Sequence, residues 1–230
     1  MSFNKSLLIL VLLCSFSISL IGCKSDDVTT NPVVVTQAKT MIVHASPNAP
    51  GVDALVDGSI VGTNLMYPNN TSYLTLNSGT RNIKVNVTGT ATTVINANLA
   101  FETNKNYSIF AVDSVSKISA IFLTDDLTAP ASGKSHVRFV HLSPNAPAVD
   151  VAVTGGPVLF SNYVFKQNSN FTPLDAGTYP LEVRLAGTPT VVLNLGSVTL
   201  QNGKIYTVFA KGFVGATGTQ ALGAQIIANN

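Results

Sequence analysis

An internal duplication constrains the fold of this chain more than any other feature of its sequence. The segment 43–53, Val-His-Ala-Ser-Pro-Asn-Ala-Pro-Gly-Val-Asp, returns 97 residues later at 140–150 as Val-His-Leu-Ser-Pro-Asn-Ala-Pro-Ala-Val-Asp. Two further pairs of segments match at offsets of 98 and 99, namely 76–80 with 174–178 and 107–111 with 206–210. A repeat at a nearly constant spacing indicates one structural unit that occurs twice. A unit of about 100 residues is typical of a β-sandwich domain.

Each copy carries the pattern of β-strands. In 83–87 and 181–185, apolar residues alternate with polar ones, as in a strand that buries one face. Glycine-containing pairs such as Asn202-Gly203 lie between such stretches and favour tight turns. We therefore predict an all-β chain with two tandem β-sandwich domains of the immunoglobulin-like or transthyretin-like kind. We place them at 39–128 and 136–230, joined by a linker at 129–135.

The residues before the repeats predict export. Lys5 precedes an apolar stretch from Leu7 to Ile21, which is the pattern of a secretory signal peptide. This stretch is short for a membrane span, which needs about 20 apolar residues. It ends in Leu20-Ile21-Gly22-Cys23, which resembles the lipobox of bacterial lipoproteins. The resemblance implies a signal peptide at 1–22 and acylation of Cys23, with palmitate as one acyl group. An ordinary signal peptide with a chance cysteine is the alternative.

The residues after Cys23 bear on the final location of the protein. Lys24 stands where inner-membrane lipoproteins carry a retention aspartate, so the sequence favours the outer membrane. The pair Asp26-Asp27 resembles the short surface-export tag of lipoproteins in the Bacteroidota, and a solvated tether is the alternative. We predict a lipidated tether at 23–38 and display on the envelope or cell surface. Several acyl chains hold a protein stably on a membrane, so the membrane is the first expected partner.

Composition excludes two classes of function. Charged residues make up only 10% of the chain, and the lysines and arginines are scattered singly. Binding of nucleic acid needs a basic patch or stripe, so we exclude nucleic acid as a partner. Cys14 lies inside the signal peptide, so the mature chain would hold no pair of cysteines. We therefore expect no disulfide and no cysteine metal site.

The repeated segments resemble the bacterial domain-of-unknown-function 4397 family. The resemblance rests on 44–53, on its copy at 141–150, and on Gly-Thr-Tyr-Pro-Leu-Glu-Val at 177–183. It covers nearly all of the mature chain and implies a secreted, tandem β-domain. The first copy departs from the pattern at Arg81, where the second has Tyr179. The family supplies no catalytic residues.

Two ionisable positions recur cleanly in both copies. They are His44 with His141, and Asp53 with Asp150. A hairpin centred in the proline-rich loop would place each histidine opposite its aspartate. A hydrolase would need in addition a nucleophile and an oxyanion site. Ser46 and Ser143 are at hand, but a serine beside a proline in a turn more often bonds the local backbone. We therefore predict that the histidines and aspartates fix the proline-rich loop, with the aspartate accepting from loop amides or from histidine.

We predict neither a cofactor nor a metal. One histidine and one aspartate per copy are too few for zinc, and Asp125-Asp126 lacks the spacing of a calcium loop. The chain lacks tryptophan, but Asn69-Asn70 with Tyr67, and Asn162 with Tyr163, are candidate amide-aromatic patches.

The function that we predict is a lipid-anchored, non-enzymatic envelope module for adhesion, envelope structure or ligand capture. Extracellular polysaccharide or protein are its candidate partners. A glycan-binding surface module is the alternative, and a hydrolase that uses the His/Asp pairs is a third and weaker one.

The anchor prediction can be tested at Cys23. Replacement Cys23→Ala removes the thiol that carries the first acyl groups, so we expect an unprocessed and unacylated chain. Intact-mass spectrometry of the protein from a lipoprotein-processing host measures both events. A wild-type chain that is cleaved but carries no acyl mass would contradict the lipoprotein interpretation.

Overall fold

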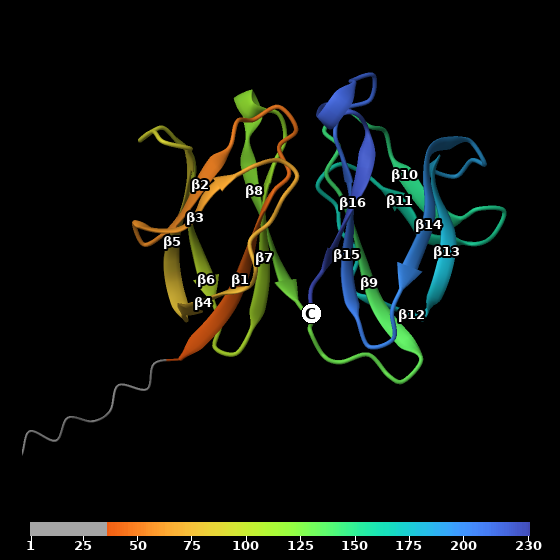
Figure 1. Cartoon of the computed structure of the whole chain (residues 1–230), viewed down its shortest axis with the longest axis horizontal. Coiled ribbons are helices and arrows are strands. Elements are labelled where there is room, and N and C mark those ends of the chain that lie inside the picture. Colours follow the sequence, from red (N-terminus) through yellow and green to blue (C-terminus); the bar gives the residue numbers. More distant parts are fainter. Residues whose placement is uncertain (1–35) are drawn as a thin grey trace, which may run out of the picture. The chain divides into compact units, whose positions relative to one another are not determined.

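The computed structural model of the protein describes residues 36–230. Nearly all of its regular structure is β, which confirms the all-β prediction (Figure 1). The first repeat holds β1 (Gln37–His44), β2 (Val52–Val56), β3 (Ser59–Leu65), β4 (Leu74–Asn77), β5 (Gly79–Val87), β6 (Thr93–Phe101), β7 (Asn106–Val112), the 3₁₀ turn η1 (Val115–Lys117) and β8 (Ser119–Asp125).

The second repeat has the same order of elements. It holds β9 (Lys134–His141), β10 (Val149–Val153), β11 (Val158–Tyr163), β12 (Thr172–Asp175), β13 (Gly177–Leu185), β14 (Val191–Leu200), β15 (Ile205–Lys211), the 3₁₀ turn η2 (Gly218–Gln220) and β16 (Gly223–Ala228).

Each repeat is a sandwich of two four-stranded sheets. In the first, the sheet β4-β1-β7-β8 covers the sheet β3-β2-β5-β6. In the second, β12-β9-β15-β16 covers β11-β10-β13-β14. The two middle strands β1 and β7 run parallel, and so do β9 and β15. Thr40 lies opposite Tyr107 in one pair and Val137 opposite Tyr206 in the other, so the duplication read from the sequence is also a duplication of strand register.

The ends of the repeats lie close to where the sequence suggests. β1 already includes Gln37 and Ala38, because both pair with β4 and Ala38 is buried. β9 begins at Lys134, inside the segment 129–135 that we assigned to the linker. The signal peptide, Cys23 and most of the tether 23–38 lie outside the described residues. Within 36–230, no helix has the length and apolar character that a membrane-spanning helix needs.

The sheets β4-β1-β7-β8 and β12-β9-β15-β16, which we call the inner sheets, pack against each other. The contact between them has a hydrophobic core of its own. From the first repeat it contains Met41, Val43, Ala45, Phe110 and Val112, and from the second Val140, Leu142, Phe209 and Ile227. The rings of Phe110 and Phe209, which are equivalent residues, meet edge to face with centroids 6.1 Å apart. Because both faces of β1, β7, β9 and β15 are covered, these strands are buried almost continuously instead of alternately.

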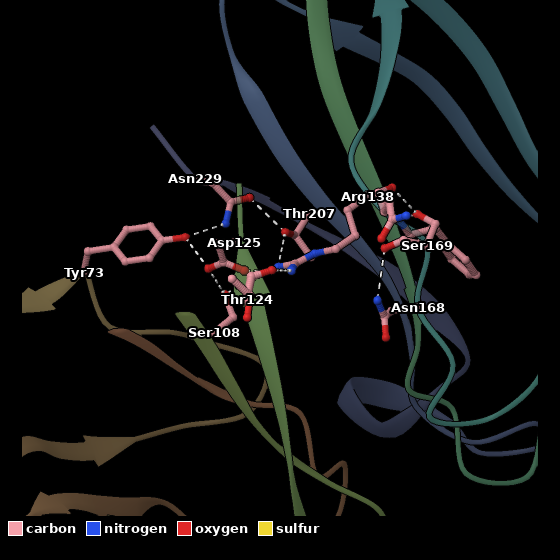
Figure 2. Close-up of polar contacts among 11 residues, drawn as sticks. Tyr73, Ser108, Thr124, Asp125, Arg138, Asn168, Ser169, Thr207 and Asn229 are labelled. Carbon is pink, nitrogen blue, oxygen red and sulfur yellow. Dashed lines mark hydrogen bonds and ion pairs between the residues drawn. The ribbon is translucent and has the colours of Figure 1, made fainter. Parts of the chain in front are cut away.

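A polar cluster lies beside this apolar core (Figure 2). Arg138 Nη1 donates to Asp125 Oδ1 at 2.7 Å, and both side chains are at least 98% buried. Nη2 donates to Thr207 Oγ1 at 2.9 Å. Asp125 Oδ2 in turn accepts from the hydroxyls of Tyr73 and Ser108, each at 2.6 Å. The cluster therefore joins residues of both repeats around one buried ion pair.

The second repeat holds the counterparts of the first-repeat residues in this cluster. Ser108 and Asp125 of the first repeat correspond to Thr207 and Asn229 of the second. Arg138 of the second repeat corresponds to Met41 of the first. Asn229 closes the cluster by donating to Tyr73 Oη at 3.0 Å. The two repeats thus contribute equivalent surfaces to the interface, but the charges differ between them.

The ion pair predicts a specific pattern of stability. Arg138→Met leaves the buried carboxylate of Asp125 without its cation. Removing one partner of a buried ion pair lowers the free energy of unfolding by about 3–5 kcal/mol. Adding Asp125→Asn, which copies Asn229, removes the stranded charge and should recover most of this loss. Urea unfolding measures the free energies. The control Lys134→Met breaks an exposed pair with Asp175, and should cost less than about 1 kcal/mol. A double variant as unstable as the single one would contradict this account.

Candidate functional site

The histidine of the repeated motif holds the proline-rich loop in both repeats. His44 Nε2–H donates to the carbonyl of Pro50 at 2.9 Å, and His141 Nε2–H donates to that of Pro147 at 3.1 Å. In the first repeat, His44 Nδ1 also accepts from the backbone N–H of Ser46 at 3.3 Å. Both imidazoles are fully buried. Each loop is therefore bonded back to the end of the strand that precedes it.

The serine and asparagine of each motif bind a second loop, which follows β7 in the first repeat and β15 in the second. The serines donate to backbone carbonyls and the asparagines accept from backbone amides. The bonds are Ser46 Oγ to Asp113 O (2.6 Å), Asn48 Oδ1 to Val115 N (2.9 Å), Ser143 Oγ to Gly212 O (2.7 Å) and Asn145 Oδ1 to Val214 N (2.8 Å). The Ser-Pro-Asn-Ala-Pro element is thus a clasp between two loops at one end of each sandwich.

The aspartates have a different role from the one that we expected. Asp53 accepts from the backbone amides of Asn64 and Gly89, at 2.8 and 3.2 Å, and these bonds lower its pKa. Asp150 accepts from the amides of Asn162 and Gly187, at 2.7 and 2.9 Å. All four donors have positive φ angles between 47° and 72°. The aspartates therefore stabilise left-handed residues within β3 and β11 and in the turns after β5 and β13, and their partners are neither the proline-rich loop nor the histidines.

These bonds bear on the catalytic alternative. In each copy the side chains of the histidine, the serine and the aspartate share no hydrogen bond, and each serine hydroxyl donates to a backbone carbonyl instead of to an imidazole. Across residues 36–230, no three side chains of histidine, cysteine, aspartate or glutamate gather as a metal site requires. Asp125, which we considered for calcium, binds Arg138.

The expected amide-aromatic patches do not form open platforms. Tyr67 meets the ring of His44 edge to face and lies under the ammonium of Lys211. Tyr163 packs on Phe139 and Phe160 in the core of the second repeat.

A cavity of about 320 Å³, which we call the end pocket, lies at the clasp end of the second repeat. Ala146 and Pro147 of the clasp form one wall, and Val214 and Leu222 of the loop 212–222 form another. The other lining residues are His141, Val149, Val183, Leu185, Val192, Leu193 and Ala210. The end pocket is therefore lined by apolar side chains and one histidine. Val192 and Val214 are 37% and 47% exposed, so the rim is open to solvent and apolar.

The loop after β15 distinguishes the end pocket from the same region of the first repeat. The first repeat has six residues there, 113–118, and Ile118 packs against the core formed by Val52 and Val85. The second repeat has eleven residues, 212–222, among them three glycines. The longer loop supplies Val214 and Leu222 to the pocket.

A second concavity of about 320 Å³, which we call the junction hollow, lies where the two repeats meet. Thr124 and Asp126 line it from the first repeat. Arg138 and the segment 168–171, Asn-Ser-Asn-Phe, line it from the second. Its lining is polar, in contrast to that of the end pocket.

Sequence reasoning named His141 and Asp126 for other roles and missed the other residues that line the two concavities. The signals that could have found them lie in the comparison of the two copies. Arg138 replaces Met41 in a strand that is otherwise apolar, and the loop 212–222 is the largest difference in length between the copies.

The fold and the clasp define a tandem β-sandwich protein in which one unit occurs twice. A family model described as a domain of unknown function (DUF4397) matches residues 38–152 and 150–230, so the chain belongs to this family, as its motifs predict. No curated protein matches the sequence significantly. Among solved structures, a family 26 carbohydrate-binding module of Amy13K from Eubacterium rectale, in complex with maltoheptaose, aligns at 10% identity. The alignment covers 82% of this chain and 96% of that one with a TM-score of 0.26, too low to support an argument.

The clasp histidines predict how stability depends on pH. Burial lowers the pKa of His44 and His141 below the ordinary value of 6.5, against the opposing effect of the bonds to Pro50 and Pro147. Below pH 6.5 the unfolded chain therefore takes up protons that the folded chain does not, so stability is present above this pH and falls as the pH falls.

Thermal melting between pH 7.5 and 5 measures this dependence. His44→Gln and His141→Gln should each flatten the pH profile relative to the parent protein. Parallel profiles for all three proteins would contradict the assignment.

Proposed function

We propose that the protein is a lipid-anchored module of the bacterial outer membrane, displayed on the envelope surface, which captures an apolar ligand group without catalysing a reaction. The observation that carries this proposal is the end pocket. Pockets for small molecules are concave and mostly apolar, with few polar groups. The end pocket has these properties, and the signature motif of the family forms part of its wall.

The lining of the end pocket defines the class of ligand. His141 is its only ionisable residue, and the Nε2–H of this imidazole is already bonded to Pro147. Burial also keeps the ring neutral, so the pocket offers little to a charged group. Binding would draw mainly on the burial of apolar surface, about 25 cal/mol per Å². A volume of about 320 Å³ suits a short aliphatic chain or a small aromatic ring system.

The position of the end pocket supports a role in capture. β1 begins at the end of the first sandwich that is opposite to its clasp, and the clasps of both repeats lie at the same end of the described fold (Figure 1). A lipidated tether that joins the fold at Gln37 would therefore leave the end pocket at the far end from its attachment.

The clasp bonds support binding over catalysis. The hydroxyls of Ser46 and Ser143 are committed to the carbonyls of Asp113 and Gly212. A serine nucleophile must instead be hydrogen-bonded to its base. Adhesion and a purely structural role in the envelope are the other expectations from the sequence, and the capture experiment separates them from ligand binding.

A cavity-filling variant tests the proposal. Ala146→Trp places an indole in the end pocket, and Ala49→Trp makes the same change at the equivalent position of the first repeat. The fluorescence of N-phenyl-1-naphthylamine, a neutral apolar probe, reports binding. We expect the parent protein and Ala49→Trp to bind the probe alike, and Ala146→Trp to bind it at least about tenfold more weakly, the equivalent of about 1.4 kcal/mol. Equal binding by both variants, or no binding by the parent protein, would overturn the proposal.

A further inference from the structure

We propose that the junction hollow is a second binding site, which takes a neutral sugar residue of a polysaccharide. The argument is independent of the end pocket, because the two sites share no residue. It rests on where the hollow lies, on the fixed side chains that line it, and on its balance of charge.

The junction hollow is assembled from both repeats. Thr124 and Asp126 belong to the end of β8 and the residue that follows it. Arg138 comes from β9, and the segment 168–171 leads into β12. Figure 2 shows Thr124 beside the guanidinium of Arg138, and Asn168 and Ser169 near the other end of the same side chain. The site therefore exists only while the inner sheets of the two repeats are packed together.

Arg138 forms a rigid wall of the hollow. Its side chain is 2% exposed and is held by the ion pair with Asp125 and the bond to Thr207. Its guanidinium also lies over the ring of Phe171, 4.5 Å from the centroid. The ion pair, the bond to Thr207 and the contact with Phe171 therefore hold the guanidinium in one place.

The segment 168–171 adds side chains of mixed hydrogen-bonding character. Asn168 Nδ2 donates to the carbonyl of Ser169 at 3.0 Å, which orients the amide and leaves its Oδ1 as an acceptor. Ser169 is buried and accepts from the N–H of Phe139, which holds the segment against β9. The side chain of Asn170 is exposed and offers both a donor and an acceptor. Phe171 is half-buried and contributes apolar surface.

The charges of the hollow exclude ionic ligands. The positive charge of Arg138 is neutralised by Asp125. Asp126 adds a carboxylate whose pKa is lowered by hydrogen bonds from Thr128, so it stays ionised and repels anions. A cation would find the carboxylate of Asp126 already near Lys105, whose positive charge also lowers its pKa. Donors, acceptors and an aromatic edge around a site without a strong net charge fit the hydroxyls and the C–H faces of a neutral sugar.

The opposite side of the interface shows why the second repeat provides this site. There, Met41 stands in place of Arg138 and Tyr73 in place of Phe171. The hydroxyl of Tyr73 donates to Asp125 and is therefore part of the buried polar cluster. Phe171 has no hydroxyl, and its segment lines the hollow instead.

Isothermal titration calorimetry with defined sugars tests the inference. The probes are maltoheptaose, cellohexaose and mannohexaose as neutral oligosaccharides, and a hexamer of galacturonic acid as the charged comparison. We expect at least one neutral probe to bind and the acidic probe not to bind. Asp126→Ala and Asn170→Ala each remove a lining side chain and should weaken that binding about tenfold. Thermal melting checks that both variants remain folded.

Two control variants separate this site from the rest of the molecule. Ser72→Ala alters the first-repeat residue that is equivalent to Asn170, and should leave sugar binding unchanged. Ala146→Trp fills the end pocket and should also leave it unchanged, so the two proposed sites can fail independently. Absence of binding by all three neutral probes, stronger binding of the acidic probe, or equal binding by Asn170→Ala and Ser72→Ala would overturn the inference.

Discussion

The contact between the inner sheets of the two repeats, with the Arg138–Asp125 ion pair inside it, is the interaction on which the rest of the structure depends. It covers the outer faces of the middle strands β1, β7, β9 and β15, which would otherwise expose a row of apolar side chains to water. The ion pair itself is a costly component, because two charges are removed from water. Its hydrogen bonds to Ser108 and Thr207 offset part of that cost and set the relative register of the two sheets.

Much of this fold could be predicted from the sequence, because its signals are local. The duplicated motif, the alternation in 83–87 and 181–185, and the turn glycines each act within a few residues. The packing of one repeat on the other could not be predicted in this way. The residues 41–43 are all apolar, Met-Ile-Val. Such a run fits a strand at the edge of one hydrophobic core as well as a strand between two cores.

The candidate sites were less accessible to sequence reasoning. Recurrence in both copies singled out the histidines and the aspartates, but their partners follow from the fold. Asp53 in β2 bonds Gly89, which is 36 residues away in the turn between β5 and β6. In the sequence Arg138 is an isolated charge, because none of the residues near it in the chain indicates a partner on the other side of the linker. The end pocket depends on the length of the loop 212–222, and hydrophobic periodicity carries no information on a loop.

The unequal charges of the interface have a consequence for copies of the protein that meet one another. If two first repeats from neighbouring molecules met through their inner sheets, each Asp125 would face a methionine, Met41. If two second repeats met, each Arg138 would face an asparagine, Asn229. Either pairing buries a charge without a counterion, whereas the pairing of unlike repeats buries none. The divergence of the two copies therefore disfavours contact between like repeats of neighbouring molecules.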